Sequence, residues 1–121
     1  MLGDEDSDNF IESKGVIYIY NDRYEGTDYD KSFNTRASDG NRLNIDIQNT
    51  SETVSVTVII YKAGCKDDVK TIAPGKSYTF QYTNDTIIGG VWEKFKIKAS
   101  DADAVGKRIS ITVNTEQFEE E

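Results

Sequence analysis

The chain has 121 residues, about the length of one compact domain, and carries 22 acidic against 14 basic residues for a net charge of −8. It has one cysteine and no histidine, which excludes Ser-His-Asp and Cys-His catalysis, imidazole metal sites and an internal disulfide framework. The negative charge also argues against nucleic acid as a partner, because binding it requires a concentrated positive field.

The acidity is concentrated at the two ends of the chain. Residues 1–12 hold five acids and residues 116–121 hold four. In residues 13–115, the remaining 13 acids nearly balance the 14 bases. We therefore expect a flexible acidic extension over 1–13, a folded domain over 14–115 and an acidic tail over 116–121. No stretch has the pattern of a signal peptide or the apolar length of a membrane helix. We expect no membrane insertion, and the sequence does not specify a compartment.

The first predicted strands lie in the N-terminal half. The run 16–20 is apolar on both faces, which predicts an inner strand or one covered by another segment. The runs 43–47 and 54–61 both alternate between apolar residues and mainly polar ones, as half-buried strands do. The turn-type composition of 49–53 predicts that these two runs form a hairpin.

The second half continues the period-two pattern. Three further runs show it: 77–82, 91–98 and 109–113. One face of the run 91–98 carries Lys94, Lys96 and Lys98. These lysines either form a solvated strand face, guard a sheet edge against pairing with another strand, or bind an anionic partner. Together the runs predict an all-β fold, a single antiparallel β-sandwich of seven or eight strands, Greek-key or jelly-roll-like.

Two sets of residues are candidates for ligand or metal binding. Asp22, Asp28 and Asp30, which we expect in one loop, could supply the oxygen ligands that calcium prefers. Ordinary use of aspartate in turns explains them equally well, and no calcium-binding motif supports a cofactor. Tyr24 and Tyr29, the aromatic residues expected in the same loop, could stack on a glycan.

Three further residues are candidates for contacts between chains. Cys65, in a predicted exposed turn, is either an inert thiol or a single crosslink to a partner. Phe10 and Ile11 are apolar residues within the polar N-terminal extension. They could dock as an added strand on the edge of a neighbouring sandwich, or fold back on their own core.

One segment is similar to a known family. The stretch 70–80, KTIAPGKSYTF, followed by DTI at 85–87, resembles the mid-region of bacterial endospore appendage subunits. These are small jelly-roll proteins that polymerise into fibres, so the resemblance implies that fold, self-assembly and a place on a cell or spore surface. The family links its subunits through cysteines in an N-terminal connector, and residues 1–15 here contain none. We therefore assign no function to any residue of this chain from the resemblance.

Two functions fit these observations, and neither is enzymatic. The leading hypothesis is a structural or assembly module that packs with copies of itself or with a protein partner. The alternative is a ligand-binding module for a glycan or another surface ligand, with or without calcium, that uses the loop aromatics and aspartates. An enzyme would need carboxylates that converge in a cleft. Because the acids lie almost entirely in predicted turns and at the chain ends, we expect no enzymatic activity.

Overall fold

A computed structural model describes residues 15–83 and 94–120 of the chain. This part is all β, with eight strands and one short 3₁₀ turn at Ala37–Asp39. The strands are β1 (Val16–Gly26), β2 (Asp28–Asn34), β3 (Arg42–Asn49), β4 (Val56–Lys62), β5 (Cys65–Ile72), β6 (Ser77–Thr83), β7 (Lys94–Asp101) and β8 (Ile109–Phe118). The predicted fold class is confirmed. No helix in the described ranges is long and apolar enough to cross a membrane.

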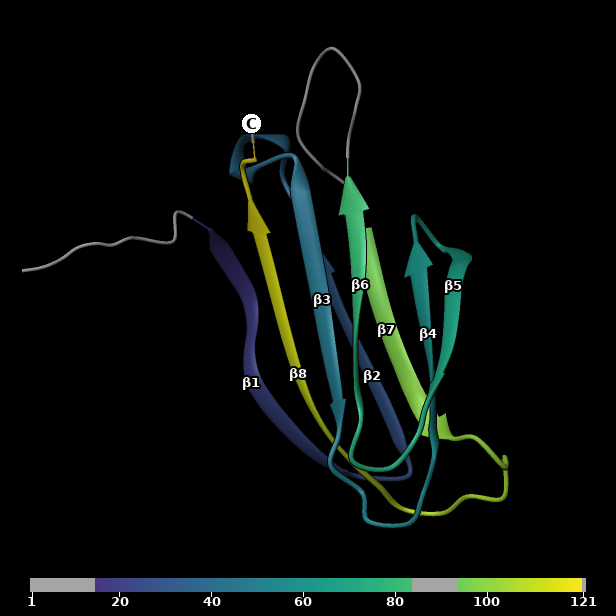
Figure 1. Cartoon of the computed structure of the whole chain (residues 1–121). Helices are drawn as coiled ribbons and strands as arrows, with labels where there is room; N and C mark the ends of the chain where they lie inside the picture. Colours follow the sequence, from purple (N-terminus) through teal and green to yellow (C-terminus); the bar gives the residue numbers. More distant parts are fainter. Residues whose placement is uncertain (1–14, 84–93, 121) are drawn as a thin grey trace, which may run out of the picture.

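The strands form two four-stranded antiparallel sheets whose order is that of a jelly roll (Figure 1). One sheet has the order β1-β8-β3-β6 and the other β2-β7-β4-β5. Four pairs join an early strand to a late one: β1 to β8, β2 to β7, β3 to β6 and β4 to β5. The chain is thus one long hairpin folded over on itself, with successive pairs alternating between the sheets, as in a jelly roll.

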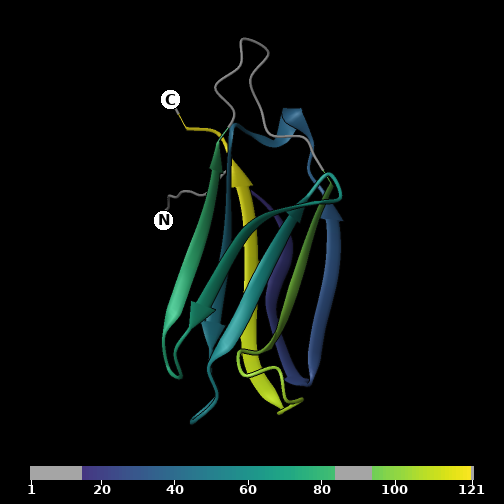
Figure 2. The same cartoon turned by 90° about the vertical axis from the view of Figure 1, so that its right-hand side faces the viewer.

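The two sheets pack face to face around one hydrophobic core, and Figure 2 shows the layers from the side. Successive side chains of a strand point to opposite faces, so alternate residues enter this core. On β3, Leu43, Ile45 and Ile47 have no exposed surface, and the same is true of Phe95 and Ile97 on β7. Period-two burial therefore places the core where the sequence predicts it.

The predicted hairpin between the runs 43–47 and 54–61 is wrong. β3 pairs with β8 and β6, whereas β4 lies in the opposite sheet between β7 and β5. The residues between these two strands cross from one layer to the other, so the turn-type composition marks a connection between sheets. Composition alone does not distinguish such a crossing from a hairpin.

A buried amide holds this crossing in place. Asn49, the last residue of β3, has no exposed surface. Its side-chain amide donates to the carbonyls of Val54 and Ile72, each at 2.9 Å, and its side-chain oxygen accepts from the backbone amide of Ser51 at 3.0 Å. One side chain therefore joins the end of β3, the crossing and the end of β5.

Strand β1 lies at the edge of its sheet, so the first of the two alternatives for residues 16–20, an inner strand, is wrong. Its register against β8 shifts twice, between Ile17 and Ile19 and between Ile19 and Asp22. Such bulges leave residues without a cross-strand partner and break the alternation. Tyr20 lies in the second break and is 76% exposed, and Ile17, which pairs with Glu116 before the first break, is 55% exposed. The apolar residues of both faces thus lie on a bulged edge strand.

The last strand continues past residue 115, where we placed the end of the domain. β8 ends at Phe118 because Gln117, which has no exposed surface, is tied into the fold. Its amide nitrogen donates to the carbonyls of Arg36 and Gly40 at 2.7 and 2.8 Å. The first residues of the predicted tail 116–121 therefore belong to the sheet. The predicted extension 1–13 lies outside the described residues.

Asp101, at the end of β7, orders the loop that leads to β8. Its carboxylate accepts hydrogen bonds from the backbone amides of Asp103, Val105 and Lys107 at 2.7, 3.1 and 3.0 Å. These bonds, above all the one from Lys107, lower the pKa of Asp101 below its ordinary value because they stabilise the charged form.

We expect Asp101→Asn to lower the free energy of unfolding at neutral pH, by an amount that shrinks as the pH falls. A carboxyl group whose pKa is lowered by folding stabilises the fold above its unfolded pKa of about 3.9, and this contribution is lost as the pH falls through the folded pKa. Urea unfolding from about pH 7 to about pH 2.5 measures the difference. Asp103→Asn, which removes an exposed ion pair with Lys107, is the control. A difference that stays constant over this range would contradict the role of the Asp101 charge.

Candidate functional site

Tyr24 and Tyr29 lie on strands β1 and β2, where we expected a loop. Their rings contact edge to face, with centroids 5.3 Å apart. Tyr29 is 4% exposed, and its hydroxyl donates to Asp22 at 2.9 Å. Burial, followed by this hydrogen bond, raises the pKa of Tyr29. Tyr29 is thus a core residue with almost no ring surface for a ligand, and Tyr24 is half-buried against the same core.

The three candidate calcium ligands also lie on strands and not together in one loop. Asp22, on β1, accepts from the Tyr29 hydroxyl and pairs with Lys31 at 3.2 Å. Asp28 and Asp30 are on β2, and Asp30 lies 3.8 Å from the ammonium of Lys96. Across the described parts of the chain, no three acidic, cysteine or histidine side chains gather into a group that could hold a metal ion. The structure therefore does not bring these three aspartates together as a metal site.

The remaining predicted contact residues are Cys65, Phe10 and Ile11. Cys65 is exposed and begins β5, while the turn before it is made by Ala63 and Gly64, both with positive φ. We expected this cysteine in the turn itself. β5 is an edge strand, so the thiol lies at the margin of a sheet. Phe10 and Ile11 lie outside the described residues.

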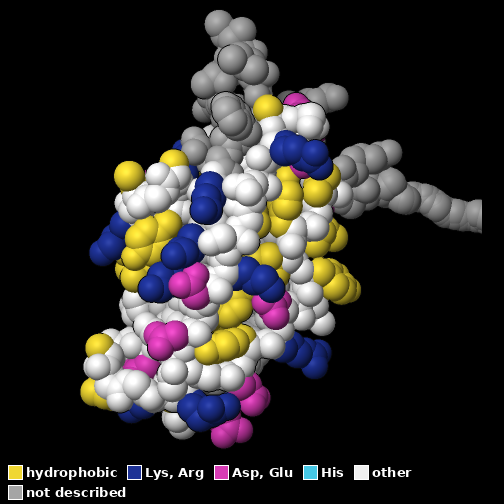
Figure 3. All heavy atoms as spheres, turned by 180° about the vertical axis from the view of Figure 1, so that it is seen from behind, with side chains coloured by type: hydrophobic (Ala, Val, Ile, Leu, Met, Phe, Trp, Pro, Cys, Tyr) yellow, Lys and Arg dark blue, Asp and Glu magenta, His cyan; other side chains and the backbone are white. Residues whose placement is uncertain are grey.

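A basic hollow lies on the outer face of the sheet β2-β7-β4-β5, and we call it the lysine hollow. It has a volume of about 310 Å³. Its lining consists of Ser32, Tyr61, Gly64, Lys94, Lys96 and Lys98. The three lysines come from alternate positions of β7, whose intervening residues Phe95 and Ile97 are buried in the core. Figure 3 shows this face, where Lys and Arg side chains (dark blue) gather beside hydrophobic ones (yellow).

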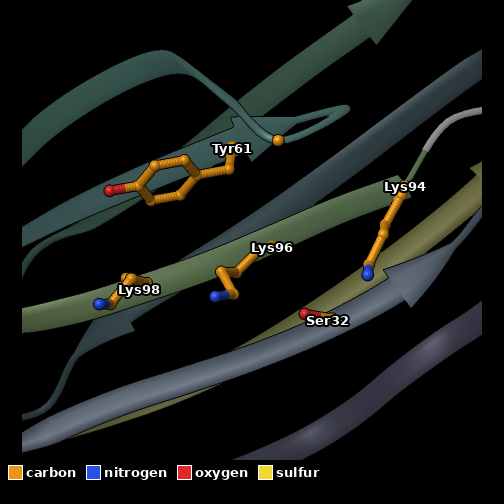
Figure 4. A pocket seen from close by; sticks show the side chains of 6 residues that line it. Ser32, Tyr61, Lys94, Lys96 and Lys98 are labelled. Carbon is orange, nitrogen blue, oxygen red and sulfur yellow. The ribbon is translucent and has the colours of Figure 1, made fainter.

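The strand register sets the layout of the lysine hollow. Lys96 lies opposite Ser32 of β2 on one side and opposite Tyr61 of β4 on the other. A hydroxyl, an ammonium and an aromatic ring therefore form one row across three strands, with Lys94 and Lys98 beside it. In Figure 4 the tyrosine ring and the lysine side chains lie on the same side of the sheet.

The charges of the lysine hollow are largely available to a ligand. Lys96 pairs with Asp30 at 3.8 Å, but both side chains are nearly half exposed, and such pairs contribute about 0–1 kcal/mol. Within residues 15–83 and 94–120, Lys94 and Lys98 form no ion pair with a carboxylate. The interpretation that Lys94, Lys96 and Lys98 guard a sheet edge is wrong, because their strand, β7, lies inside its sheet between β2 and β4.

A second surface feature is the free edge of β6. β6 is the last strand of the sheet β1-β8-β3-β6, and in Figure 2 it lies at the margin of the molecule. Its sequence, SYTFQYT, has no charged residue. The other edge strands, β1, β2 and β5, each carry acidic and basic residues. Charges protect sheet edges against pairing with other chains. β6 is the one edge strand among those described that carries no charge of its own, and the ammonium of Lys70 on β5 lies over it, 4.7 Å from the ring centre of Tyr78.

The outer face of the same sheet carries two hollows with a different character. Their volumes are about 600 and 330 Å³. The larger contains one base, Arg23, and one acid, Glu25, and the smaller contains two acids and no base. The larger hollow therefore has no excess charge, and the smaller has two acids against the three lysines of the lysine hollow.

The sequence predicted that Lys94, Lys96 and Lys98 share one strand face, but it did not predict all the strands of their sheet. β2 and the first half of β5 were not predicted as strands, because acidic and basic residues interrupt both runs. A signal was present in β2, where Tyr29 and Phe33 recur on one face. Tyr61 was predicted on a strand, but only the register places it beside Lys96.

No protein-family model matches this chain, and no curated protein does. Distant similarity extends to solved structures of infectious bursal disease virus. The Gx strain structure matches with a TM-score of 0.44 and 10% sequence identity over 84% of this chain. The structure of T=1 particles derived from the virus matches with a TM-score of 0.39 and 9% sequence identity over 87% of this chain. This chain covers 30% and 32% of the viral chains, less than a third of their length. The resemblance to endospore appendage subunits gains no support from these comparisons.

Proposed function

We propose that this protein is a non-enzymatic structural module that assembles with copies of itself through the free edge of β6. The observation that carries this proposal is the absence of charge from β6, in contrast to the other described edge strands. The non-enzymatic part of the proposal is supported by composition, since the chain has no histidine. An unpaired strand edge presents backbone N–H and C=O groups that a second strand can bind.

A second copy of the chain is a suitable partner for this edge. A two-fold axis at Phe80 would bring two β6 strands together antiparallel, with Tyr78 opposite Tyr82 and Thr79 opposite Gln81. No like charges would meet along this interface, because the strand has none. Aromatic and polar pairs of this kind stabilise antiparallel strands by about 0.2–1 kcal/mol each. The two four-stranded sheets would form one continuous sheet with a self-complementary contact, the commonest geometry of dimers.

The test is to place lysines on β6. In the arrangement above, Thr79→Lys/Gln81→Lys sets lysine against lysine twice, and we expect dimerisation to weaken about tenfold or more. The control, Glu25→Gln/Thr27→Lys, makes the same change in net charge at two exposed positions at the end of β1. Sedimentation equilibrium of the full chain measures the dissociation constants, and circular dichroism verifies that each variant is folded.

Two outcomes would contradict the proposal. The natural chain could be a monomer at the highest attainable concentration, or the β6 variant could associate as strongly as the natural chain. The substitution Phe10→Ser/Ile11→Ser separates β6 pairing from docking by the N-terminal segment. Pairing through β6 predicts that this variant still dimerises, and loss of the dimer would assign assembly to Phe10 and Ile11 instead.

A further inference from the structure

We infer that the lysine hollow binds an acidic saccharide, a sugar chain that carries carboxylate or sulfate groups. This site lies on the sheet β2-β7-β4-β5, whereas β6 belongs to the other sheet. Binding there is independent of the proposed assembly.

The cationic groups are fixed relative to one another by the strand. Lys94, Lys96 and Lys98 are alternate residues of β7, so their Cα atoms span about 13 Å along it. Because β7 lies between two hydrogen-bonded neighbours and buries Phe95 and Ile97, the backbone that carries these lysines is rigid. A ligand with several negative charges along its length can contact more than one ammonium without reorganising the sheet.

The non-cationic lining favours a saccharide over other anions. Tyr61 is half-buried on β4 opposite Lys96, and its ring offers an apolar surface to the faces of a sugar. Ser32, opposite Lys96 on β2, adds a hydroxyl that can both donate and accept a hydrogen bond. Binding sites of this kind combine an aromatic surface with a few placed polar groups.

The experiment measures binding of defined oligosaccharides to the full chain by calorimetry at low salt. The probes are a galacturonic acid tetrasaccharide, which carries carboxylates, and a heparin-derived tetrasaccharide, which carries sulfates. Maltotetraose is the neutral probe and tetraglutamate is the acidic peptide probe. We expect at least one acidic saccharide to bind, with an affinity that falls as salt is raised, and neither maltotetraose nor tetraglutamate to match it.

The variants locate the site. We expect Lys94→Gln/Lys98→Gln to weaken binding about tenfold, because it removes two of the three ammonium groups that line the lysine hollow. Tyr61→Leu, which keeps an apolar side chain at this position, should also weaken it. The control Lys76→Gln/Lys107→Gln removes two lysines outside the lysine hollow and should bind as the natural chain does.

Three results would overturn the inference. Neither acidic saccharide binds; the Lys94/Lys98 variant binds as tightly as the control; or tetraglutamate binds as tightly as the saccharides and Tyr61→Leu has no effect. The last result would assign the site to acidic peptides. Dimerisation through β6 would stand in each case, because none of the substituted residues lies on that strand.

Discussion

Replacing Gly40 with alanine is expected to lower the free energy of unfolding by about 3–5 kcal/mol. Gly40 follows the 3₁₀ turn and has φ +139°, a backbone conformation that other residues rarely adopt. A Cβ atom there would lie 2.2 Å from both the carbonyl carbon and the carbonyl oxygen of Phe118. Because these are backbone atoms at the end of β8, the clash can be relieved only by moving the strand. The carbonyl of Gly40 also accepts the amide of Gln117, so movement would disturb a second buried contact.

Gly75→Ala is the matched control for Gly40→Ala. Gly75 has φ +77°, but a Cβ atom added there meets nothing within 4 Å. The control therefore places an alanine at a positive φ without the clash, and we expect a loss of about 1–2 kcal/mol. Chemical denaturation of both variants measures the difference. Equal losses at the two positions would contradict the close approach of Gly40 to β8.

Asn49→Ala is expected to lower the free energy of unfolding by about 3–4 kcal/mol. The substitution removes three hydrogen bonds and leaves the carbonyls of Val54 and Ile72 and the amide of Ser51 without their side-chain partner. A buried polar group that loses its partner destabilises a fold by about 1–3 kcal/mol. Such a loss is a large share of the typical total stability of about 5–15 kcal/mol.

Asn44→Ala, on the outer face of the same strand, is the control for Asn49→Ala. Asn44 is half-buried and makes no side-chain hydrogen bond with any described residue. We expect its replacement to change stability by less than about 0.5 kcal/mol. Urea unfolding of both variants gives the comparison. A similar small effect at Asn49 would mean that its hydrogen bonds do not hold the crossing between the sheets.

The fold class was predictable from the sequence because burial in a sandwich follows every second residue. Leu43, Ile45 and Ile47 show this alternation, and all three are in the core. The partner of each strand was not predictable in the same way. The runs 43–47 and 54–61 alternate in the same way whether their strands share a sheet or lie in opposite sheets. Alternation therefore could not show that the predicted hairpin was wrong. The difference depends on Asn49, whose bonds to Val54 and Ile72 have no local signature.

The candidate sites depend even more on contacts between distant strands. Tyr29 was expected in a loop because aspartates surround it, but its position opposite Ala99 of β7 places it in a strand and in the core. Lys94, Lys96 and Lys98 were recognised as one face, and the sequence left open whether their strand was an edge. Only the pairing with β2 and β4 puts Tyr61 beside them and makes the row a hollow. The uncharged edge strand also appears only when strand order is known.

Hydrogen exchange of the β6 backbone amides, measured at a low and a high concentration of the full chain, tests the proposed assembly most directly. Pairing of two β6 strands predicts that residues 77–83 become more protected at the higher concentration, while β1, β2 and β5 keep their exchange rates. Protection of β6 that does not change with concentration, or a gain confined to another edge strand, would contradict assembly through this edge.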